Sequence, residues 1–380
     1  MSHFQLTEEH ELMRSIAREF ARTEVAPVTK VLDQAHEFPF ALVKRCAELN
    51  FLGIPIPEEY GGAGADCLSE CLIIEEIAKE NGSLALIIDA HTSLGCLPLF
   101  LAGTEAQKKK YLVPAAKGEK LMSFGLTEPG AGSDAAASKT VAVADGDEWV
   151  INGSKAWITN IGFAEIYIVT AKTDPDKGAR GISAFIVEKG TPGFEIGKPE
   201  KKMGLHSSAT GELFFRNCRI PKENMLGGMN KGFPLFMKGL DEGRIAISAM
   251  AVGMAQGALD RAVSYAKERI QFGKPIAEHQ AVAFYIADMA TEIELARTML
   301  YRVAAMRDSG VPFTQEAAML KLFSSEMCVR VCDKAVQIHG GNGYSQEYEV
   351  ERFLRDSKLL TIGEGTSEIC KVVISRTVLS

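Results

Sequence analysis

Residues 124–134 read Phe124-Gly125-Leu126-Thr127-Glu128-Pro129-Gly130-Ala131-Gly132-Ser133-Asp134, and they stand where the pattern of the chain changes. Before them, apolar residues recur at three- and four-residue spacing, which is typical of helices. From about residue 120 to 226, short alternating runs separated by Gly and Asp turns predict strands. After residue 232, long helical patterns return. The order predicts an α+β protein with three domains: an N-terminal helical domain over 1–119, a middle antiparallel β-domain over 120–230 and a C-terminal helical bundle over 231–380.

The elements expected in each part can be given by their ranges. An N-terminal helix starts near Thr7 and ends at Pro27, and further helices lie near Pro39–Leu49 and Ser69–Glu80. The strands are expected at Thr140–Ala144, Glu148–Asn152, Ile166–Lys172, Ile182–Lys189 and Glu212–Arg216. The bundle helices are expected at Leu240–Glu268, Glu278–Arg307 and Gln315–Ile338.

Composition excludes several classes of protein. The chain has 380 residues with a formal net charge of −7, whereas a nucleic-acid binder needs a basic face. The most apolar run, Leu84–Ala102, is interrupted by polar residues and Pro98, so no membrane span is expected. The first residues lack the apolar segment of an export signal. The eight cysteines complete no zinc pattern and are expected to be reduced and mostly buried, without a metal, in a soluble cytoplasmic protein.

The loop at 124–134 is rich in glycine, hydroxyl and carboxylate groups. Such a loop exposes N–H groups that can hold a polar ring edge or a phosphate. It lacks the strand, spacing and helix of a dinucleotide-binding fingerprint. A plain surface loop is the alternative.

Residues 155–160 read Lys155-Ala156-Trp157-Ile158-Thr159-Asn160 and follow a predicted strand. Because side chains two apart on a strand share a face, the Trp157 ring and the Thr159 hydroxyl should lie together. They could hold a flat heterocycle; packing of Trp157 in the core is the alternative.

Two further motifs lie in the third domain. Arg269 and Gln271, beside the Gly273-Lys274-Pro275 turn, could grip a pyrophosphate, because a guanidinium matches two phosphate oxygens. Residues 337–343, Gln-Ile-His-Gly-Gly-Asn-Gly, end a helix with three glycines, more than a helix cap requires. An ordinary helix end is the alternative in the first case.

Near the C-terminus, Leu359-Leu360-Thr361-Ile362-Gly363-Glu364-Gly365-Thr366-Ser367-Glu368-Ile369 places one carboxylate between two glycines, just before a helix begins at Thr366 or Ser367. The glycines allow a ligand to approach closely, and the free N–H groups of the helix can hold developing negative charge. This equipment suits removal of a proton next to a carbonyl. A surface turn is the alternative.

Together, in this order and at these spacings, the motifs resemble the flavin-dependent acyl-CoA dehydrogenases over essentially the whole chain, in particular short-chain, branched-chain or alicyclic members. The resemblance implies N-terminal helices, a middle β-domain and a C-terminal four-helix bundle, assembled as a homotetramer. It also implies FAD as cofactor, an acyl-CoA substrate and an electron-transferring flavoprotein as the usual electron acceptor.

Site residues follow from the same resemblance. Those that would bind FAD are Phe124, Leu126, Thr127, Gly132, Ser133, Trp157, Ile158, Thr159, Arg269, Gln271, Phe272, Gln280, Gln337, Gly340, Gly341, Thr366 and Glu368. Arg269 and Gln280, and the 337–341 turn from a neighbouring subunit, would hold the pyrophosphate and adenosine half of FAD. Those that would meet the CoA thioester are Ser133, Asp241, Arg244 and Gly365.

The implied chemistry is removal of the α-proton by Glu364 with transfer of the β-hydride to flavin N5. Gly363 replaces the Tyr of many straight-chain members, which should widen the acyl cavity for branched or cyclic groups. Some branched-chain members carry their base where this chain has Gly243, so Glu364 keeps the role. Asp89, on a helix that lines the acyl pocket in the family, is either paired structurally or a second base for 1,4-elimination on a cyclic acyl group.

Rival interpretations remain within and outside the redox class. An acyl-CoA oxidase is usually longer, and a nitroalkane oxidase has Asp where this chain has Glu364. A DNA-associated relative without dehydrogenase activity would need a basic C-terminal surface, and a purely structural helical protein would carry no flavin.

Overall fold

The N-terminal region of this computed structural model, which describes residues 6–379, is helical. Its α-helices are α1 (Glu8–Phe20), α2 (Ala26–Ala35), α3 (Phe40–Glu48), α4 (Cys67–Ala78), α5 (Gly82–Asp89), α6 (Leu97–Ala102), α7 (Glu105–Gln107) and α8 (Val113–Ala116). Residues 1–5 and 380, which the expected outer domains and the export argument include, lie outside the described residues. Helix α1 begins where expected, because the Thr7 side chain accepts from His10 N and the His10 ring meets Thr7 N.

The expectation that Pro27 ends the first helix is wrong. A π-helical turn, Ala21–Val25, joins α1 to α2, and Pro27 lies in the first turn of α2. A proline is tolerated there because its missing N–H would have no intrahelical acceptor and its fixed φ suits a helix. The chain therefore remains helical to Ala35.

The middle region is a twisted sheet. Its strands are β1 (Met122–Gly125), β2 (Val141–Asp145), β3 (Glu148–Thr159), β4 (Ile166–Lys172), β5 (Ile182–Glu188), β6 (Phe194–Ile196), β7 (Thr210–Pro221) and β8 (Met225–Leu226). Their order is β6-β7-β3-β2-β4-β5-β8, with β1 beside β4. The expected strands are all present. The sheet is mainly antiparallel, as expected, and β1 and β2 each pair with β4 in parallel.

The C-terminal region is a bundle of long helices. Its elements are α9 (Gly232–Glu268), β9 (Ile270–Gln271), β10 (Lys274–Pro275), α10 (Gln280–Asp308), α11 (Thr314–His339), α12 (Val350–Leu360) and α13 (Ser367–Val378). Helix α9 starts eight residues before the expected Leu240. Its first residue, Gly232, touches the backbone of Ser183 and Ala184 so closely that a Cβ would collide with both. Gly232, which the sequence suggests is part of a loop, therefore lies where helix α9 packs against the sheet.

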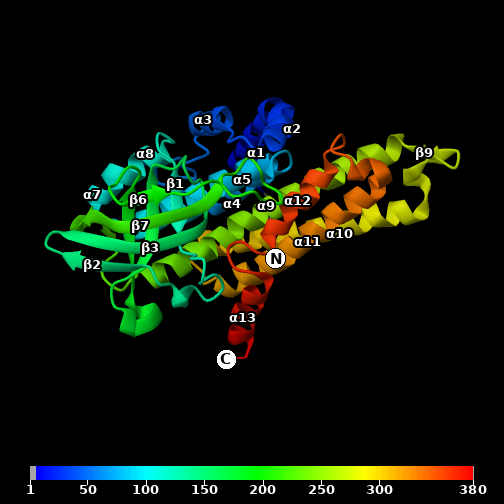
Figure 1. Cartoon of the computed structure of the whole chain (residues 1–380). Coiled ribbons are helices and arrows are strands. Elements are labelled where there is room, and N and C mark those ends of the chain that lie inside the picture. Colours follow the sequence, from blue (N-terminus) through cyan, green and yellow to red (C-terminus); the bar gives the residue numbers. More distant parts are fainter. Residues whose placement is uncertain (1–5, 380) are drawn as a thin grey trace.

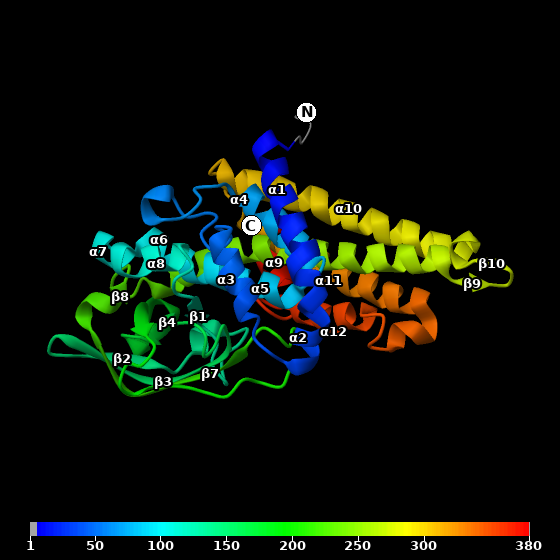
Figure 2. The ribbon, with the colours of Figure 1, turned by 90° about the horizontal axis from the view of Figure 1, so that it is seen from above.

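The sheet and the β9–β10 hairpin lie at opposite ends of the long helices (Figures 1 and 2). The N-terminal helices cover the middle of the molecule, where α4 is buried along its whole length and packs on α9. The helical run Gly82–Ala102 passes a length-and-composition test for a membrane span, contrary to the expectation that it is too interrupted. However, 83% of its most apolar window is buried, so it is a core helix.

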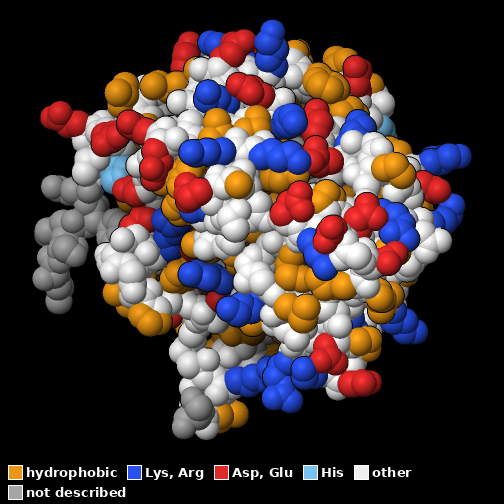
Figure 3. Space-filling view, turned by 90° about the vertical axis from the view of Figure 1, so that its left-hand side faces the viewer, with side chains coloured by type: hydrophobic (Ala, Val, Ile, Leu, Met, Phe, Trp, Pro, Cys, Tyr) orange, Lys and Arg blue, Asp and Glu red, His pale blue; other side chains and the backbone are white. Residues whose placement is uncertain are grey.

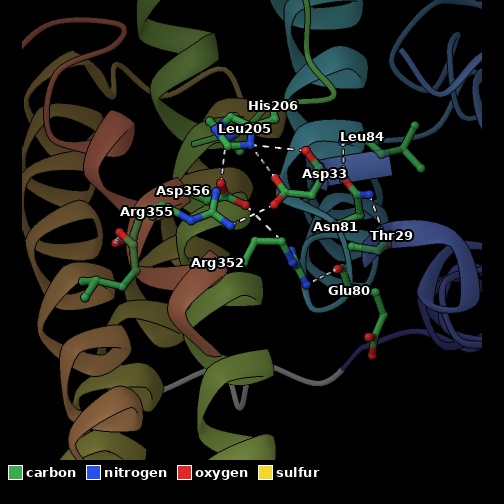
Figure 4. Close-up of polar contacts among 12 residues, drawn as sticks. Thr29, Asp33, Glu80, Asn81, Leu84, Leu205, His206, Arg352, Arg355 and Asp356 are labelled. Atoms are coloured by element: carbon green, nitrogen blue, oxygen red, sulfur yellow. Dashed lines mark hydrogen bonds and ion pairs between the residues drawn. The ribbon is translucent and has the colours of Figure 1, made fainter. Parts of the chain in front are cut away.

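A polar network ties the three regions together (Figure 4). Asp33 on α2 accepts from Arg355 Nη2 of α12 at 2.8 Å, and its Oδ1 lies 3.2 Å from His206 Nδ1, in the segment between β6 and β7. The neighbouring Leu205 N donates to Asp356 Oδ1 at 2.5 Å. Because each region supplies a partner, their relative positions, and hence the site between them, are fixed by specific bonds.

Candidate active site

Glu364 stands on a turn with an unusual backbone. Its φ is +54° and that of Gly365 is +100°, and α13 begins directly afterwards, where the Thr366 hydroxyl accepts from Ile369 N at 3.3 Å. A left-handed conformation is uncommon for a residue with a Cβ and is concentrated at functional sites. The expected turn and the expected start of the helix are both present.

Two cations lie beside this turn. Lys321, on α11, is fully buried and donates from Nζ to Gly365 O at 2.6 Å. Arg244, on α9, is 5% exposed and is held by Asp241 at 2.6 Å, and a Cβ at Gly365 would lie 3.5 Å from its Nη2. Burial raises the pKa of Glu364, and the hydrogen bond with Asp89 and the charges of these two cations oppose that rise.

Asp89 is the second carboxyl of the site. It is fully buried, and its Oδ1 accepts from Ser93 Oγ at 2.5 Å. Burial first, and then the negative charge of Glu364, raises the pKa of Asp89 well above its usual value. Two adjacent buried carboxylates cannot both ionise easily, and the stronger rise at Asp89 makes it the member of the pair that holds a proton more tightly.

The facing oxygens of this pair are unusual. Asp89 Oδ2 and Glu364 Oε2 are buried, and among residues 6–379 no donor reaches either of them except the proton that the two carboxyls share. Two carboxyls that meet in a buried place and shift each other's pKa are typical of a functional site. Chemically, Glu364 can accept a proton from a group brought to this place.

Small residues on α9 surround the Glu364 carboxyl. A Cβ at Gly243 would collide with Glu364 Oε2 and lie 3.1 Å from Leu94 Cδ2. One turn earlier, a Cβ at Gly239 would lie 3.9 Å from Phe124 Cε2. At Gly363 a Cβ would meet only Leu359, at 3.7 Å. A catalytic base carried at position 243, as in some branched-chain members, would therefore occupy the same space as the Glu364 carboxyl.

The 124–134 loop and the 155–160 segment lie side by side. Ala156 N donates to Thr127 O at 2.9 Å, and Lys155 Nζ donates to Leu126 O at 3.1 Å. Ser133 and Gly132 are exposed, and a Cβ at Gly132 would meet nothing within 4 Å. The Phe124 ring stacks on Phe236 of α9 at 4.1 Å. The loop thus connects the exposed side of the sheet with the neighbourhood of Glu364.

Trp157 is 64% exposed and has a φ of +60°. Thr159 is partly exposed, whereas Ile158 between them is 2% exposed. Trp157 and Thr159 therefore face outward together, as expected, and the alternative that Trp157 packs in the core is wrong. The Trp157 indole is therefore accessible to a ligand on this face.

A third group of expected residues lies at the far end of the bundle, away from the sheet (Figure 1). Arg269, Gln271 and Phe272 are exposed on the β9–β10 hairpin, and Phe272 is 94% exposed. Gln280 opens α10 beside that hairpin, and the turn after Gln337 contains Gly340 and Gly341, both with open space at a Cβ. A single chain does not bring this group to Trp157 or Glu364.

The remaining expected residues lie near the base turn. Thr366 caps α13, and Glu368 is exposed in its first turn. Asp241 Oδ2 accepts from Thr314 Oγ1 at 2.7 Å, so both Asp241 oxygens are engaged by the protein. Lys321 was not expected from the sequence, because a lysine on an otherwise regular helix resembles a solvated residue.

All eight cysteines are free and buried, which confirms the expectation of reduced thiols. Over residues 6–379, no group of three or more His, Cys, Asp or Glu side chains is arranged to hold a metal ion.

Comparison with known proteins defines the class. Three family models, described as the N-terminal, middle and C-terminal domains of acyl-CoA dehydrogenase, match residues 7–119, 123–218 and 230–379. The chain is an oxidoreductase that acts on CH–CH bonds. It belongs to the acyl-CoA dehydrogenase family.

Individual relatives match along the whole chain. A short-chain-specific acyl-CoA dehydrogenase of Clostridium acetobutylicum is 50% identical, with 98% of each chain covered. The solved butyryl-CoA dehydrogenase of Megasphaera elsdenii is 45% identical, with a TM-score of 0.98 over 100% of both chains. A structure described as "Electron transferring flavoprotein of Acidaminococcus fermentans: Towards a mechanism of flavin-based electron bifurcation" is 47% identical, with a TM-score of 0.98 over 100% of both chains.

Proposed function

We propose that this protein catalyses the FAD-dependent dehydrogenation of a short, branched or cyclic acyl-CoA to the enoyl-CoA, with Glu364 as the base. The observation that carries the proposal is the buried Glu364 carboxyl, whose Oε2 lies against Gly243 and which pairs with Asp89. The small residue at Gly243 leaves the carboxylate room that a side chain would fill.

The residues present fit a flavin. The exposed Trp157 indole and the Thr127 backbone lie next to each other on one side of the sheet, which suits a flat heterocycle with polar edges. Phe124 to Ser133 and Trp157 to Thr159 would hold the ring. FAD, when bound there, supplies the acceptor for the β-hydrogen and its electron pair.

The protein's own groups handle the α-proton. Glu364, ionised because Asp89 holds the proton of the pair, accepts it, and the electrons of that C–H bond form the new double bond. The Glu364 N–H polarises the thioester oxygen and so makes the α-carbon more acidic. Arg244, Gly365 and Ser133 are the remaining groups proposed to meet the thioester end.

The test is flavin bleaching by butyryl-CoA without oxygen. Glu364→Gln should keep FAD but reduce flavin about 10²- to 10⁴-fold more slowly, the range for losing a general base. The matched control is Glu59→Gln, an exposed glutamate in the N-terminal region. Normal reduction by the Glu364 variant would refute the assignment.

A second candidate function is 1,4-elimination on an alicyclic acyl group, with Asp89 as a second base. Its support is the buried Asp89 carboxyl beside Glu364, together with the absence of a side chain at Gly363. Rates with cyclohexanecarboxyl-CoA and cyclohexenecarboxyl-CoA should be compared with those for butyryl-CoA and isobutyryl-CoA. If Asp89→Asn turns over every substrate normally, Asp89 is not a base.

Assembly belongs to the same proposal. Because Arg269, Gln280 and the 337–341 turn lie at the far end of the bundle, they would reach the FAD of another copy, as in a homotetramer. The likeness to the Acidaminococcus chain supports an electron-transferring flavoprotein as acceptor. Acidic and basic side chains both occur over the face in Figure 3. The proposed domains are 1–119, 120–230 and 231–380, in a cytoplasmic protein.

A further inference from the structure

Lys321 is a buried cation with no carboxylate in direct contact. The side chain is fully buried on α11, and the hydrogen bond that it makes goes to the backbone carbonyl of Gly365 at 2.6 Å. Buried charges are normally paired with an opposite charge, because removing an ion from water is unfavourable. A lysine kept there for packing alone would be better replaced by an apolar residue.

The hydrogen bond to Gly365 explains why a lysine is found at position 321. Gly365 follows Glu364, and both have positive φ, a conformation that is uncommon for a residue with a Cβ such as Glu364. The hydrogen bond from Lys321 Nζ to Gly365 O therefore attaches this turn to helix α11. The lysine charge also lies near enough to Glu364 to lower the pKa of that carboxyl.

We infer that Lys321 is a positioning residue that clamps the Glu364–Gly365 turn and so holds the base in place. This rests on the proposed function of Glu364. Lys321 does not touch the substrate; it acts through the Gly365 carbonyl and through its charge.

Several titratable groups on neighbouring elements act on Glu364 and Lys321. Glu364 is influenced by Asp89, Lys321 and Arg244, and Lys321 by Glu364, Arg244, Cys370 and Glu368. Burial lowers the pKa of Lys321, and the negative groups oppose this. Removing the lysine leaves Arg244 as the remaining cation beside Glu364.

The experiment measures exchange of the butyryl-CoA α-hydrogen with solvent deuterium, and anaerobic flavin reduction, as functions of pH in the holoenzyme. Lys321→Met removes both the charge and the N–H donor, Lys321→Gln removes the charge but keeps a donor, and Lys321→Arg keeps the charge. Lys44→Met, an exposed lysine on α3, is the matched control.

The Met variant should slow exchange and flavin reduction about 10-fold or more. The low-pH (acid) limb of its pH–rate profile should move to higher pH, because a carboxylate without its cation binds protons more tightly. The Gln variant should show the shifted limb with a smaller loss of rate. The Arg variant should keep the limb of the wild type.

Two results overturn the inference: an unshifted limb in folded Met and Gln variants, or loss of folding in all three variants. The latter indicates a structural residue rather than one confined to the base turn. If the wild type itself neither exchanges the α-hydrogen nor bleaches with any acyl-CoA, the proposed function fails instead.

Discussion

Lys155 Nζ lies 2.8 Å from Glu128 Oε1 inside the middle domain, where Lys155 is fully buried and Glu128 is 7% exposed. The carboxylate also accepts from Lys139 N and Thr140 N, and the ammonium donates to Thr170 Oγ1. Burial disfavours the carboxylate, yet the charge of Lys155 and these N–H groups hold the pKa of Glu128 below its usual value. The pair therefore fastens the 124–134 loop to β3.

Breaking this pair should destabilise the protein. Lys155→Met leaves the Glu128 carboxylate buried without its cation, which typically costs about 3–5 kcal/mol. Urea unfolding of the FAD-free protein measures the loss. Lys139→Met is the control, because the Lys139 side chain is exposed and only its backbone N–H meets Glu128. Equal stability of the two variants would contradict a structural role for the pair.

Adding one methyl group at Gly243 should displace the base. In Gly243→Ala the new Cβ would collide with Glu364 Oε2, and a displacement of about 1 Å can cost about 100-fold in rate. Gly239→Ala, whose Cβ would meet Pro98 and Phe124 at 3.6 and 3.9 Å, should lose far less. Both variants should retain FAD, so kcat/KM with butyryl-CoA and flavin content are measured together. A normal rate for Gly243→Ala places Glu364 elsewhere during turnover.

Much of the fold could be predicted because its elements are long and strongly periodic. All expected strands and all three long helices exist. The wrong predictions concern residue types that occur both inside helices and at their ends. Pro27 ends helices in general but here lies in a first turn, and Gly232 looks like loop but lets α9 approach β5. Only tertiary packing decides such positions.

The site residues that could be predicted are those marked by their immediate neighbours in the sequence. Two flanking glycines identify Glu364, and the Trp–x–Thr step identifies the outward face of β3. Lys321 carries no local signal, because its burial and its contact with Gly365 arise from the packing of α11 on the base turn. The proximity of Asp89 to Glu364 is likewise a property of the fold, since 275 positions of chain separate them, counted from their residue numbers.

Trp157 should report flavin binding by fluorescence. The chain has two tryptophans; Trp149 is 6% exposed, whereas Trp157 is 64% exposed. FAD-free protein should emit with a large contribution from the water-exposed indole, and added FAD should quench it. Trp157→Phe should lose most of this response, and Trp149→Phe should keep it. A response that survives in Trp157→Phe would show that the flavin binds away from this indole.

Glu70 on α4 should give the stability a pH dependence opposite to that of ordinary acids. Burial is the main reason that the pKa of Glu70 rises from 4.5 to about 7, although Thr92 Oγ1 donates to it at 2.6 Å. Between these two pH values the folded state binds the proton and the unfolded state does not. This contribution to stability is therefore present at low pH and is lost as pH rises toward 7.

Glu70→Gln removes this titration. The stability of the variant relative to the wild type should increase between pH 4 and pH 8 by about 3 kcal/mol at most, the value of a shift of about 2.5 pKa units. Urea unfolding at several pH values measures the difference, and Glu59→Gln, exposed to solvent, should show no such trend. A constant difference between the Glu70 variant and the wild type across this range would mean that Glu70 stays ionised in the folded protein.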